Sequence, residues 1–260
     1  MISSCVALSE GTYTVDESKV FIPFDASMHQ LKDRPASLLV DIVPFLIRTK
    51  NDLLIIDPGL GYRLPDGHLQ IQENLRRQGV EPEEVTLVLL SHLHKDHFGG
   101  TCYLQEGTYR LMFPKAQYLI QQGEVDEAFA RRGRSLEMDK LEFMVRQPQW
   151  VLLQGNGSNG PDIHYEITGG HTTYHQAFRI VGADGEHYFY GGDVLPQPGQ
   201  LIRRFVAKYD QDGKVSAARR IEFGERAAQE HLICLYFHSA AMPMSRVARS
   251  EDGKFSVLPV

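Results

Sequence analysis

The chain has 260 residues, 42% of them hydrophobic, and a formal net charge of −6 at pH 7. This length and composition can bury a large core, so we expect a single domain over residues 1–260. The acidic balance argues against nucleic acid and anionic membranes as partners, and no apolar stretch reaches membrane-spanning length. We therefore expect a cytoplasmic protein, without a signal peptide, that acts on a small-molecule substrate.

Hydrophobic runs in the first half of the chain predict a series of strands bounded by glycine, proline and polar residues. A helix with a modest apolar side is expected between them, and a segment rich in helix formers and mixed charge follows the last one. The expected strands cover residues 20–24, 37–49, 53–56, 85–90 and 117–120, the helix covers 69–78, and a helical insertion covers about 123–147.

The second half of the chain repeats this strand-rich character. Its composition predicts a turn-rich loop over 155–161 and a helix over 214–229, with strands on both sides. Two strand-rich halves with outer helices indicate a layered α/β sandwich. The expected strands of this half cover residues 150–153, 163–168, 176–181, 187–190 and 232–237.

Four potential metal ligands lie in six positions directly after the expected strand 85–90: His92, His94, Asp96 and His97. In an extended chain, side chains two residues apart point the same way, so His92 and His94 can share one ion. Asp96 and His97 then reach a neighbouring position as the chain turns. Imidazole and carboxylate ligands without thiolate suit zinc, iron, manganese or cobalt. The run predicts a metal site, and two adjacent ions fit it better than one.

Three further ligand-type residues follow strands of the second half. His171 and Asp193 each come after a pair of glycines, which lets the backbone turn sharply and present the side chain. His238 directly follows the strand expected at 232–237. Any one of them alone indicates a capped turn or a hydrogen-bonded core residue. Together with the first cluster, they favour a metal site.

Asp57-Pro58-Gly59 precedes these ligand-type residues in the chain. In the order of these motifs, the sequence resembles the metallo-β-lactamase fold superfamily. The resemblance implies an αββα four-layer sandwich and two divalent metal ions, with Zn²⁺ expected first and iron, manganese or cobalt as alternatives. It places Asp57 behind a metal-ligating histidine, although an ordinary turn aspartate is the alternative. We expect His175 to lie beside the site or to belong to the strand that follows. The implied ligand sets are His92, His94 and His171 for one metal and Asp96, His97 and His238 for the other, with Asp193 bridging the pair.

The resemblance also implies a reaction. A dinuclear-metal hydrolase would act on a small ester or lactone by attack of a metal-bridging hydroxide, with Asp193 and Asp96 as catalytic residues and Asp96 relaying a proton to the leaving group. Among relatives, the chain looks most similar to the group of N-acyl-homoserine lactonases and methyl-parathion-type hydrolases, in which homodimers are common.

Other activities stay open at this point. Within hydrolases, they are a glyoxalase II type thioesterase and an organophosphate hydrolase. From another class, they are a di-iron oxygen-reducing protein and a metal-dependent binding protein.

The substrate pocket is the part of the protein that the sequence indicates least clearly. Lactonases of this group carry a tyrosine three residues after the bridging aspartate, where this chain has Pro196. Tyr174, Tyr190 or Tyr236 could supply a phenol instead, although each also suits a packed core. Phe98, just past the motif, is expected either to wall the pocket or to cap the core. We assign Phe98 and Tyr174 to the substrate pocket.

Overall fold

The computed structural model describes residues 4–203 and 205–260 of the chain. Its first large sheet contains six strands from the first half of the chain. Three successive strand pairs, from the middle of this sheet to one edge, run parallel, which explains why these strands read as unbroken apolar runs. In spatial order the strands are β1 (Cys5–Ala7), β5 (Phe45–Arg48), β6 (Leu53–Ile56), β7 (Leu87–Leu89), β10 (Gln117–Gln121) and β11 (Trp150–Leu153).

The second large sheet contains seven strands from the second half of the chain. In spatial order they are β12 (Gly157–Asn159), β13 (Ile163–Ile167), β14 (Gln176–Val181), β15 (His187–Tyr190), β16 (Ile233–Leu235), β17 (Met244–Arg249) and β18 (Phe255–Pro259). Two smaller sheets complete the fold, and they are formed by β3 (Phe21–Pro23), β2 (Gly11–Val15) and β4 (Leu38–Ile42), and by β8 (Cys102–Gln105) with β9 (Thr108–Leu111).

The two large sheets pack face to face around a shared core. Side chains alternate between the two faces of a strand, so Leu54 and Ile56 of β6 enter this core while Ile55 points the other way. From the second sheet, Phe178 and Leu235 enter the same core. Each large sheet therefore buries one face against the other sheet and has an outer face left to cover.

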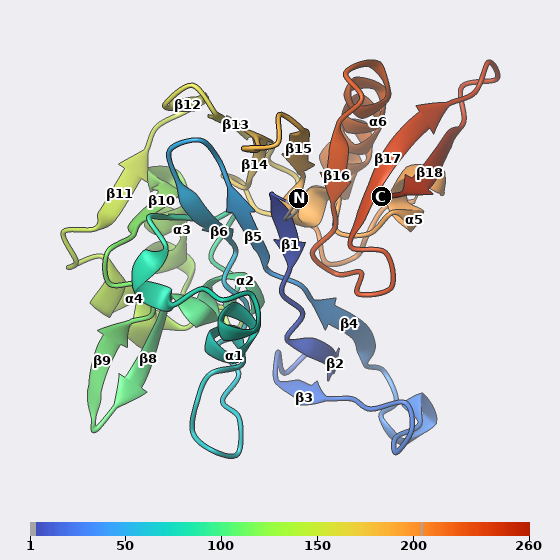
Figure 1. The fold of residues 1–260 in the computed structure, drawn as a ribbon. Coiled ribbons are helices and arrows are strands. Elements are labelled where there is room, and N and C mark those ends of the chain that lie inside the picture. The colour runs from blue at the N-terminus through green and yellow to red at the C-terminus, as the bar shows by residue number, and fades with distance from the viewer. Residues whose placement is uncertain (1–3, 204) are drawn as a thin grey trace.

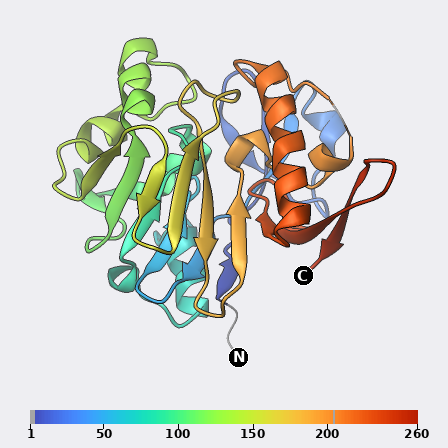
Figure 2. The same ribbon diagram turned by 90° about the horizontal axis from the view of Figure 1, so that it is seen from above.

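Helices cover both outer faces. The outer face of the first sheet shares a hydrophobic cluster with four helices, and α6 packs on the second sheet through Phe223 and Ala227. Figures 1 and 2 show these helices on opposite sides of the strands. This arrangement confirms the expected αββα sandwich. No helix of the described residues is long and apolar enough to cross a membrane. The helices are α1 (Gln70–Arg77), α2 (Lys95–Phe98), α3 (Gln122–Arg131), α4 (Met138–Met144), α5 (Gly199–Ile202) and α6 (Gly213–Gln229).

Two expected elements differ in the structure. The strand expected over 37–49 is two strands, β4 and β5, which lie in different sheets. Pro44 lies between them, and a proline has no backbone N–H to continue a ladder. The loop expected over 155–161 contains β12, which pairs with β13 at the sheet edge.

Strand ends place the ligand-type residues at one edge of the sandwich. Parallel strands end at the same edge of a sheet, and β6 and β7 are parallel, as are β15 and β16. Asp57 follows β6, the first ligand cluster follows β7, and Asp193 and His238 follow β15 and β16. The fold thus brings residues from both halves of the chain to one place.

Candidate metal centre

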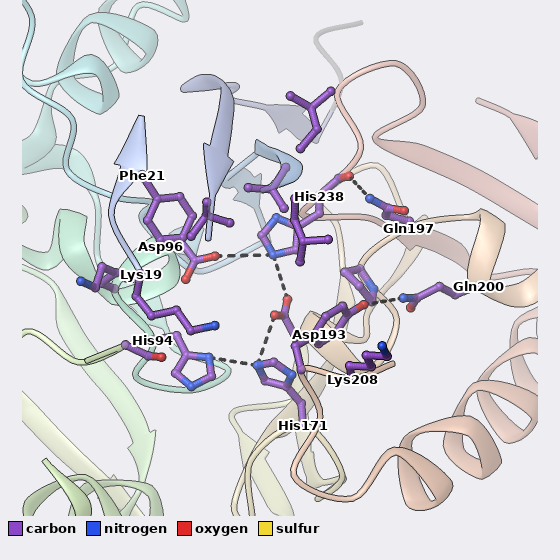
Figure 3. Close-up of a pocket in the computed structure, with 18 of the residues that line it drawn as sticks. Lys19, Phe21, His94, Asp96, His171, Asp193, Gln197, Gln200, Lys208 and His238 are labelled. Atoms are coloured by element: carbon purple, nitrogen blue, oxygen red, sulfur yellow. Dashed lines mark hydrogen bonds and ion pairs between the residues drawn. The ribbon is translucent and has the colours of Figure 1, made fainter. Parts of the chain in front are cut away.

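The structure brings together all seven residues that the sequence suggested as metal ligands. His92 and His94 lie in the loop after β7, and Asp96 and His97 lie in α2. The other three come from the second sheet, where Asp193 lies in a short 3-10 helix, Gly192–Val194. Figure 3 shows His94, Asp96, His171, Asp193 and His238 turned toward a common space.

Asp193 lies between two groups of histidines. One of its oxygens, Oδ2, lies 3.3 Å from His171 Nε2, and that nitrogen lies 3.0 Å from His94 Nδ1. The other oxygen, Oδ1, lies 3.1 Å from His97 Nε2 and 3.3 Å from His238 Nε2. A carboxylate with its two oxygens directed to different nitrogen groups is the arrangement that a bridging ligand requires.

Each side of Asp193 offers a compact set of ligand atoms. In both sets, the potential ligand atoms lie within 4.8 Å of one another. The first set is His92, His94 and His171, and the second is Asp96, His97 and His238. These sets are the two that the resemblance implied.

Unpartnered polar atoms at the centre of the cluster fit bound cations. His92 Nε2 is buried and has no hydrogen-bond partner among the described residues, and the buried His97 Nε2 and Asp193 Oδ1, which face each other at 3.1 Å, form no hydrogen bond either. Leaving such atoms unpaired in the interior costs about 1–3 kcal/mol for each group. Nitrogen and carboxylate oxygen donors are the ligands that zinc and similar divalent ions prefer. The donor set therefore fits a dinuclear divalent site.

The charges of the site also fit bound divalent cations. Burial lowers the pKa of His92 and His94 well below the ordinary value, and neighbouring histidines lower it further. Their rings are therefore neutral, which is the form that binds a metal. Burial raises the pKa of Asp193, but the adjacent His97, His238 and His171 outweigh it and hold that pKa well below its usual range. Asp193 is therefore an ionised carboxylate.

Hydrogen-bond contacts orient several histidines of the cluster through the ring nitrogen that faces away from it. His97 Nδ1 lies 2.8 Å from Asp57 Oδ2, and His238 Nδ1 lies 2.7 Å from the carbonyl oxygen of Asp41. Such contacts fix the tautomer and the orientation of a ligating ring. Asp57 thus lies where the sequence suggested, behind a histidine of the cluster.

His175 contacts the site through the backbone of Asp193. The amide of Asp193 donates to His175 Nε2 at 3.1 Å, and Thr168 Oγ1 lies 2.7 Å from the other ring nitrogen. Burial lowers the pKa of His175 well below its ordinary value, so the ring is neutral and can accept this bond. His175 therefore positions the carboxylate at the centre of the cluster.

Asp210 and Arg220 belong to the site but have no signal in the sequence. Asp210 Oδ1 lies 3.0 Å from His171 Nδ1, and its other oxygen pairs with Arg220 at 3.1 Å. Arg220, on α6, also donates to the carbonyl oxygen of Val194, next to Asp193. Neither residue follows a strand, and 39 residues separate Asp210 from His171. Only the folded chain shows that they act together.

A cavity of about 580 Å³ opens over the cluster. Its base includes His94, Asp96, His171, Asp193 and His238, so a ligand in the cavity reaches both sides of the site. The remaining lining residues are Val15, Lys19, Phe21, Leu38, Leu39, Val40, Lys95, Ser135, Pro196, Gln197, Gln200, Phe205, Lys208, Tyr209 and Gln211.

The assignment of Phe98 and Tyr174 to the substrate pocket was wrong. Phe98 is 1% exposed and belongs to the core on the outer face of the first sheet. Successive helical residues are turned by about 100°, so α2 directs Asp96 and His97 to the site and Phe98 into this core. Tyr174 is 38% exposed, does not line the cavity, and its ring packs over Gly123.

Another tyrosine brings a phenol to the cavity. The hydroxyl of Tyr190 donates to Asp57 Oδ2 at 2.6 Å, and that of Tyr236 pairs with Ser245, so both are used in the interior. Tyr209 lines the cavity, with its ring centroid 5.8 Å from that of His171, and Pro196 lines it as well. Sequence spacing could not find Tyr209, because it lies outside every motif.

Comparison with known proteins agrees with this geometry. The family model described as the metallo-beta-lactamase superfamily matches residues 40–222. An N-acyl homoserine lactonase of Bacillus thuringiensis is 26% identical to the chain over 106 residues. That match covers 41% of this chain and only 37% of the lactonase.

Solved structures with a similar fold cover almost the whole chain. AidC, described as a dizinc quorum-quenching lactonase, has a TM-score of 0.73 at 20% identity, covering 98% of this chain and 94% of AidC. A probable metal-dependent hydrolase from Staphylococcus aureus has a TM-score of 0.75 at 19% identity, covering 99% and 96%. At these identities the likeness concerns the fold, whereas the family model covers more than half of the chain. The chain belongs to the metallo-β-lactamase superfamily.

Proposed function

We propose that this protein is a dinuclear-metal hydrolase that cleaves a small ester or lactone. The observation that carries the proposal is the placement of Asp193, whose two oxygens face separate histidine groups at the base of an open cavity. The similarity to lactonases supports the substrate class. Two divalent cations bound there would lower the pKa of a water molecule and polarise a carbonyl oxygen.

The side chains of the cluster bind and orient. Asp57 and Asp210 accept from the outward ring nitrogens of His97 and His171, so the inward nitrogens of both rings are directed to the shared space. His175 fixes the backbone of Asp193. The site is thereby preorganised, and little rearrangement is needed when the substrate binds.

Asp96 is suited to proton transfer. Its side chain is 12% exposed and lines the cavity, whereas the His97 ring is fully buried. Its Oδ2 lies 3.6 Å from His238 Nε2, which is beyond a normal hydrogen bond and leaves the carboxylate able to accept a proton. As the ester bond breaks, Asp96 can pass a proton from the attacking water to the leaving alcohol.

Tyr209 is suited to bind the substrate carbonyl. Its hydroxyl oxygen accepts a hydrogen bond from Gln200 Nε2 at 2.7 Å, so its own O–H is available to a ligand in the cavity. We therefore propose that Tyr209 supplies the phenol that Pro196 cannot provide. A Tyr209→Phe variant is expected to lose about tenfold in kcat/KM with unchanged metal content.

A substrate panel with controlled metal content tests the proposed function. The protein is assayed with lactones, aryl esters, thioesters and organophosphates, before and after chelation, and after addition of zinc, manganese, cobalt or iron. We expect turnover of at least one ester or lactone class, its loss on chelation, and its recovery with at least one metal. Turnover that survives complete metal removal would contradict the proposal, as would failure across the panel with bound iron and metal-dependent oxygen consumption.

A further inference from the structure

Three lysines line the cavity and have no ionic partner. Lys19, Lys95 and Lys208 form no ion pair or side-chain hydrogen bond with any other described residue. Lys140 behaves differently, since it pairs with Glu137 at 3.0 Å and donates to a backbone carbonyl. In a chain with a net charge of −6, three unpaired cations around one cavity are a concentrated positive patch.

The carboxylates of the site do not neutralise these lysines. Asp96 and Asp193 are the only acidic residues among the described residues that line the cavity. Asp193 faces three histidines at 3.1 to 3.3 Å, and Asp96 faces two histidines at 3.6 and 3.7 Å. The lysines are therefore free to bind an anion that enters the cavity.

Two of the lysines lie toward the His94 and His171 side of the cluster. Lys19 lines the cavity together with His94, and Figure 3 draws the two residues near each other. Lys208 precedes Tyr209, whose ring packs against His171, and Figure 3 draws Lys208 on the side of His171. This side of the cavity is cationic.

The opposite side, next to His238, is apolar. The carbonyl oxygen of Asp41 in β4 accepts from His238 Nδ1, so β4 lies against this histidine. Leu38 and Leu39 of the same strand line the cavity and are 55% and 41% exposed, and Val40 lines it too. Exposed aliphatic side chains at a cavity wall are suited to hold an apolar group of a ligand.

We propose that the substrate carries an anionic group on one side of the scissile carbonyl and an apolar group on the other. Lys19 and Lys208 bind the anionic group, and the wall formed by Leu38, Leu39 and Val40 holds the apolar group. The inference rests on the proposed function and names its substrate class: an anionic ester or lactone with an apolar arm.

Matched esters test the inference. The zinc-loaded protein is assayed with 4-carboxyphenyl hexanoate and with 4-carbamoylphenyl hexanoate, which share the acyl group and differ in the charge of the leaving group. We expect kcat/KM to be about tenfold higher for the anionic ester, because a charge-assisted hydrogen bond discriminates by roughly this amount. In the Lys19→Gln/Lys208→Gln double variant, the ratio should fall to within about twofold of unity. Lys50→Gln, at an exposed lysine outside the cavity, should leave the ratio unchanged.

A binding measurement separates this inference from the proposed function. The amide analogues 4-hexanamidobenzoate and 4-hexanamidobenzamide are titrated calorimetrically into the metal-free protein, where a carboxylate cannot bind to zinc. We expect tighter binding of the anionic amide, and loss of that difference in the double variant. If neither ester is hydrolysed, the proposed function fails, while the binding preference still supports the lysine site. Equal turnover of both esters with equal binding of both amides would overturn the inference, as would a preference that persists in the double variant.

Discussion

Asp210 connects His171 of the candidate metal centre to the body of the second sheet. It accepts from His171 Nδ1 and pairs with Arg220, which also bonds the carbonyl oxygen of Val194 beside Asp193. The side chains of Asp210 and Arg220 are 0% and 4% exposed, so this contact is shielded from solvent and held firmly. One buried carboxylate therefore orients His171 and is linked to the segment that carries the central carboxylate.

The first prediction concerns this contact. In Asp210→Asn, the side chain keeps its shape but loses its charge, so His171 is held less firmly in its ligating tautomer. Loss of such a supporting carboxylate typically costs 10–100-fold in metal affinity or activity. We expect about this decrease in zinc affinity, measured by competition with a chromogenic chelator. Asp126→Asn, at an exposed aspartate of α3, is the matched control, and equal zinc affinity in both variants would contradict the assigned role of Asp210.

The second prediction follows from the burial of Phe98. Because its ring fills the outer core, Phe98→Ala is expected to lower the free energy of unfolding by about 3–5 kcal/mol. Phe98→Leu should leave the relative kcat/KM for esters of different acyl length unchanged. Phe205→Leu, at a ring that does line the cavity, should alter those ratios. Urea denaturation and an acyl-length series provide the two measurements. A changed substrate profile in Phe98→Leu would show that this ring does line the substrate pocket.

The sequence predicted the clustering of these histidines and aspartates well and the cavity walls poorly, for a physical reason. His92, His171 and Asp193 are ligand-type residues at strand ends, and this combination can be recognised without knowing the fold. Tyr209 and Lys208 lie in a segment before α6 with no periodicity, so their position depends on how the folded chain brings that segment over the site. Phe98 was misplaced because its direction depends on the single turn of α2.

At the scale of secondary structure, the parallel strands at the centre of the first sheet were the most predictable. β6 and β7 are buried on both faces, so their sequences are unbroken apolar runs. β17 was not predicted, because its buried positions are Ser245 and Val247, and its alternation of buried and half-buried residues gives a weak hydrophobic signal. Short edge strands such as β1 offer still less signal.

The third prediction concerns the loop that follows β6. Glu10, between β1 and β2, is buried against this loop. Its Oε2 accepts from the amide of Leu60 at 2.7 Å, and its Oε1 has no partner among the described residues. Burial raises the pKa of Glu10 from about 4.5 to about 8. In the unfolded chain the carboxyl returns to its ordinary pKa, so its ionisation opposes folding. The contribution of Glu10 to stability is full below about pH 4.5 and is lost as the pH rises through about 8.

A Glu10→Gln variant should remove this pH dependence. The amide can still accept from Leu60 and carries no charge, so above pH 8 the variant is expected to be more stable than the original by about 1–4 kcal/mol. The measurement is the difference in unfolding free energy at several values between pH 5 and 9. Glu17→Gln, at an exposed glutamate, should show no such change. A difference that is constant with pH would show that Glu10 is ionised in the folded protein.

Across the whole molecule, the cluster joins the two large sheets. His92, His94, Asp96 and His97 follow a strand of the first sheet, while the other three ligand-type residues come from the second sheet. The unpartnered atoms at the centre lie between the two. Bound cations should therefore stabilise the packing of one half of the sandwich on the other, in addition to their chemical role.

The fourth prediction tests this coupling. A ligand at 100 times its dissociation constant stabilises the folded state by about 2.7 kcal/mol, and each kcal/mol raises Tm by roughly 2–4 °C in a chain of this size. We expect zinc to raise the Tm of the metal-free protein by about 5–10 °C, measured by calorimetry. Magnesium at the same concentration is the control, since the imidazole-rich donor set does not suit it. Equal Tm values with and without zinc would exclude a site that spans the sheets.

The measurement that tests the central claim most directly is a titration of the metal-free protein with zinc, in which bound metal and ester hydrolysis are followed together. The two ligand sets around Asp193 predict that two equivalents of zinc bind per chain and that hydrolysis reaches its maximum at the second. In Asp193→Asn, the second equivalent should bind weakly and hydrolysis should fall about 100-fold or more. Full activity at a single equivalent, or full activity in Asp193→Asn, would contradict a dinuclear site organised by this carboxylate.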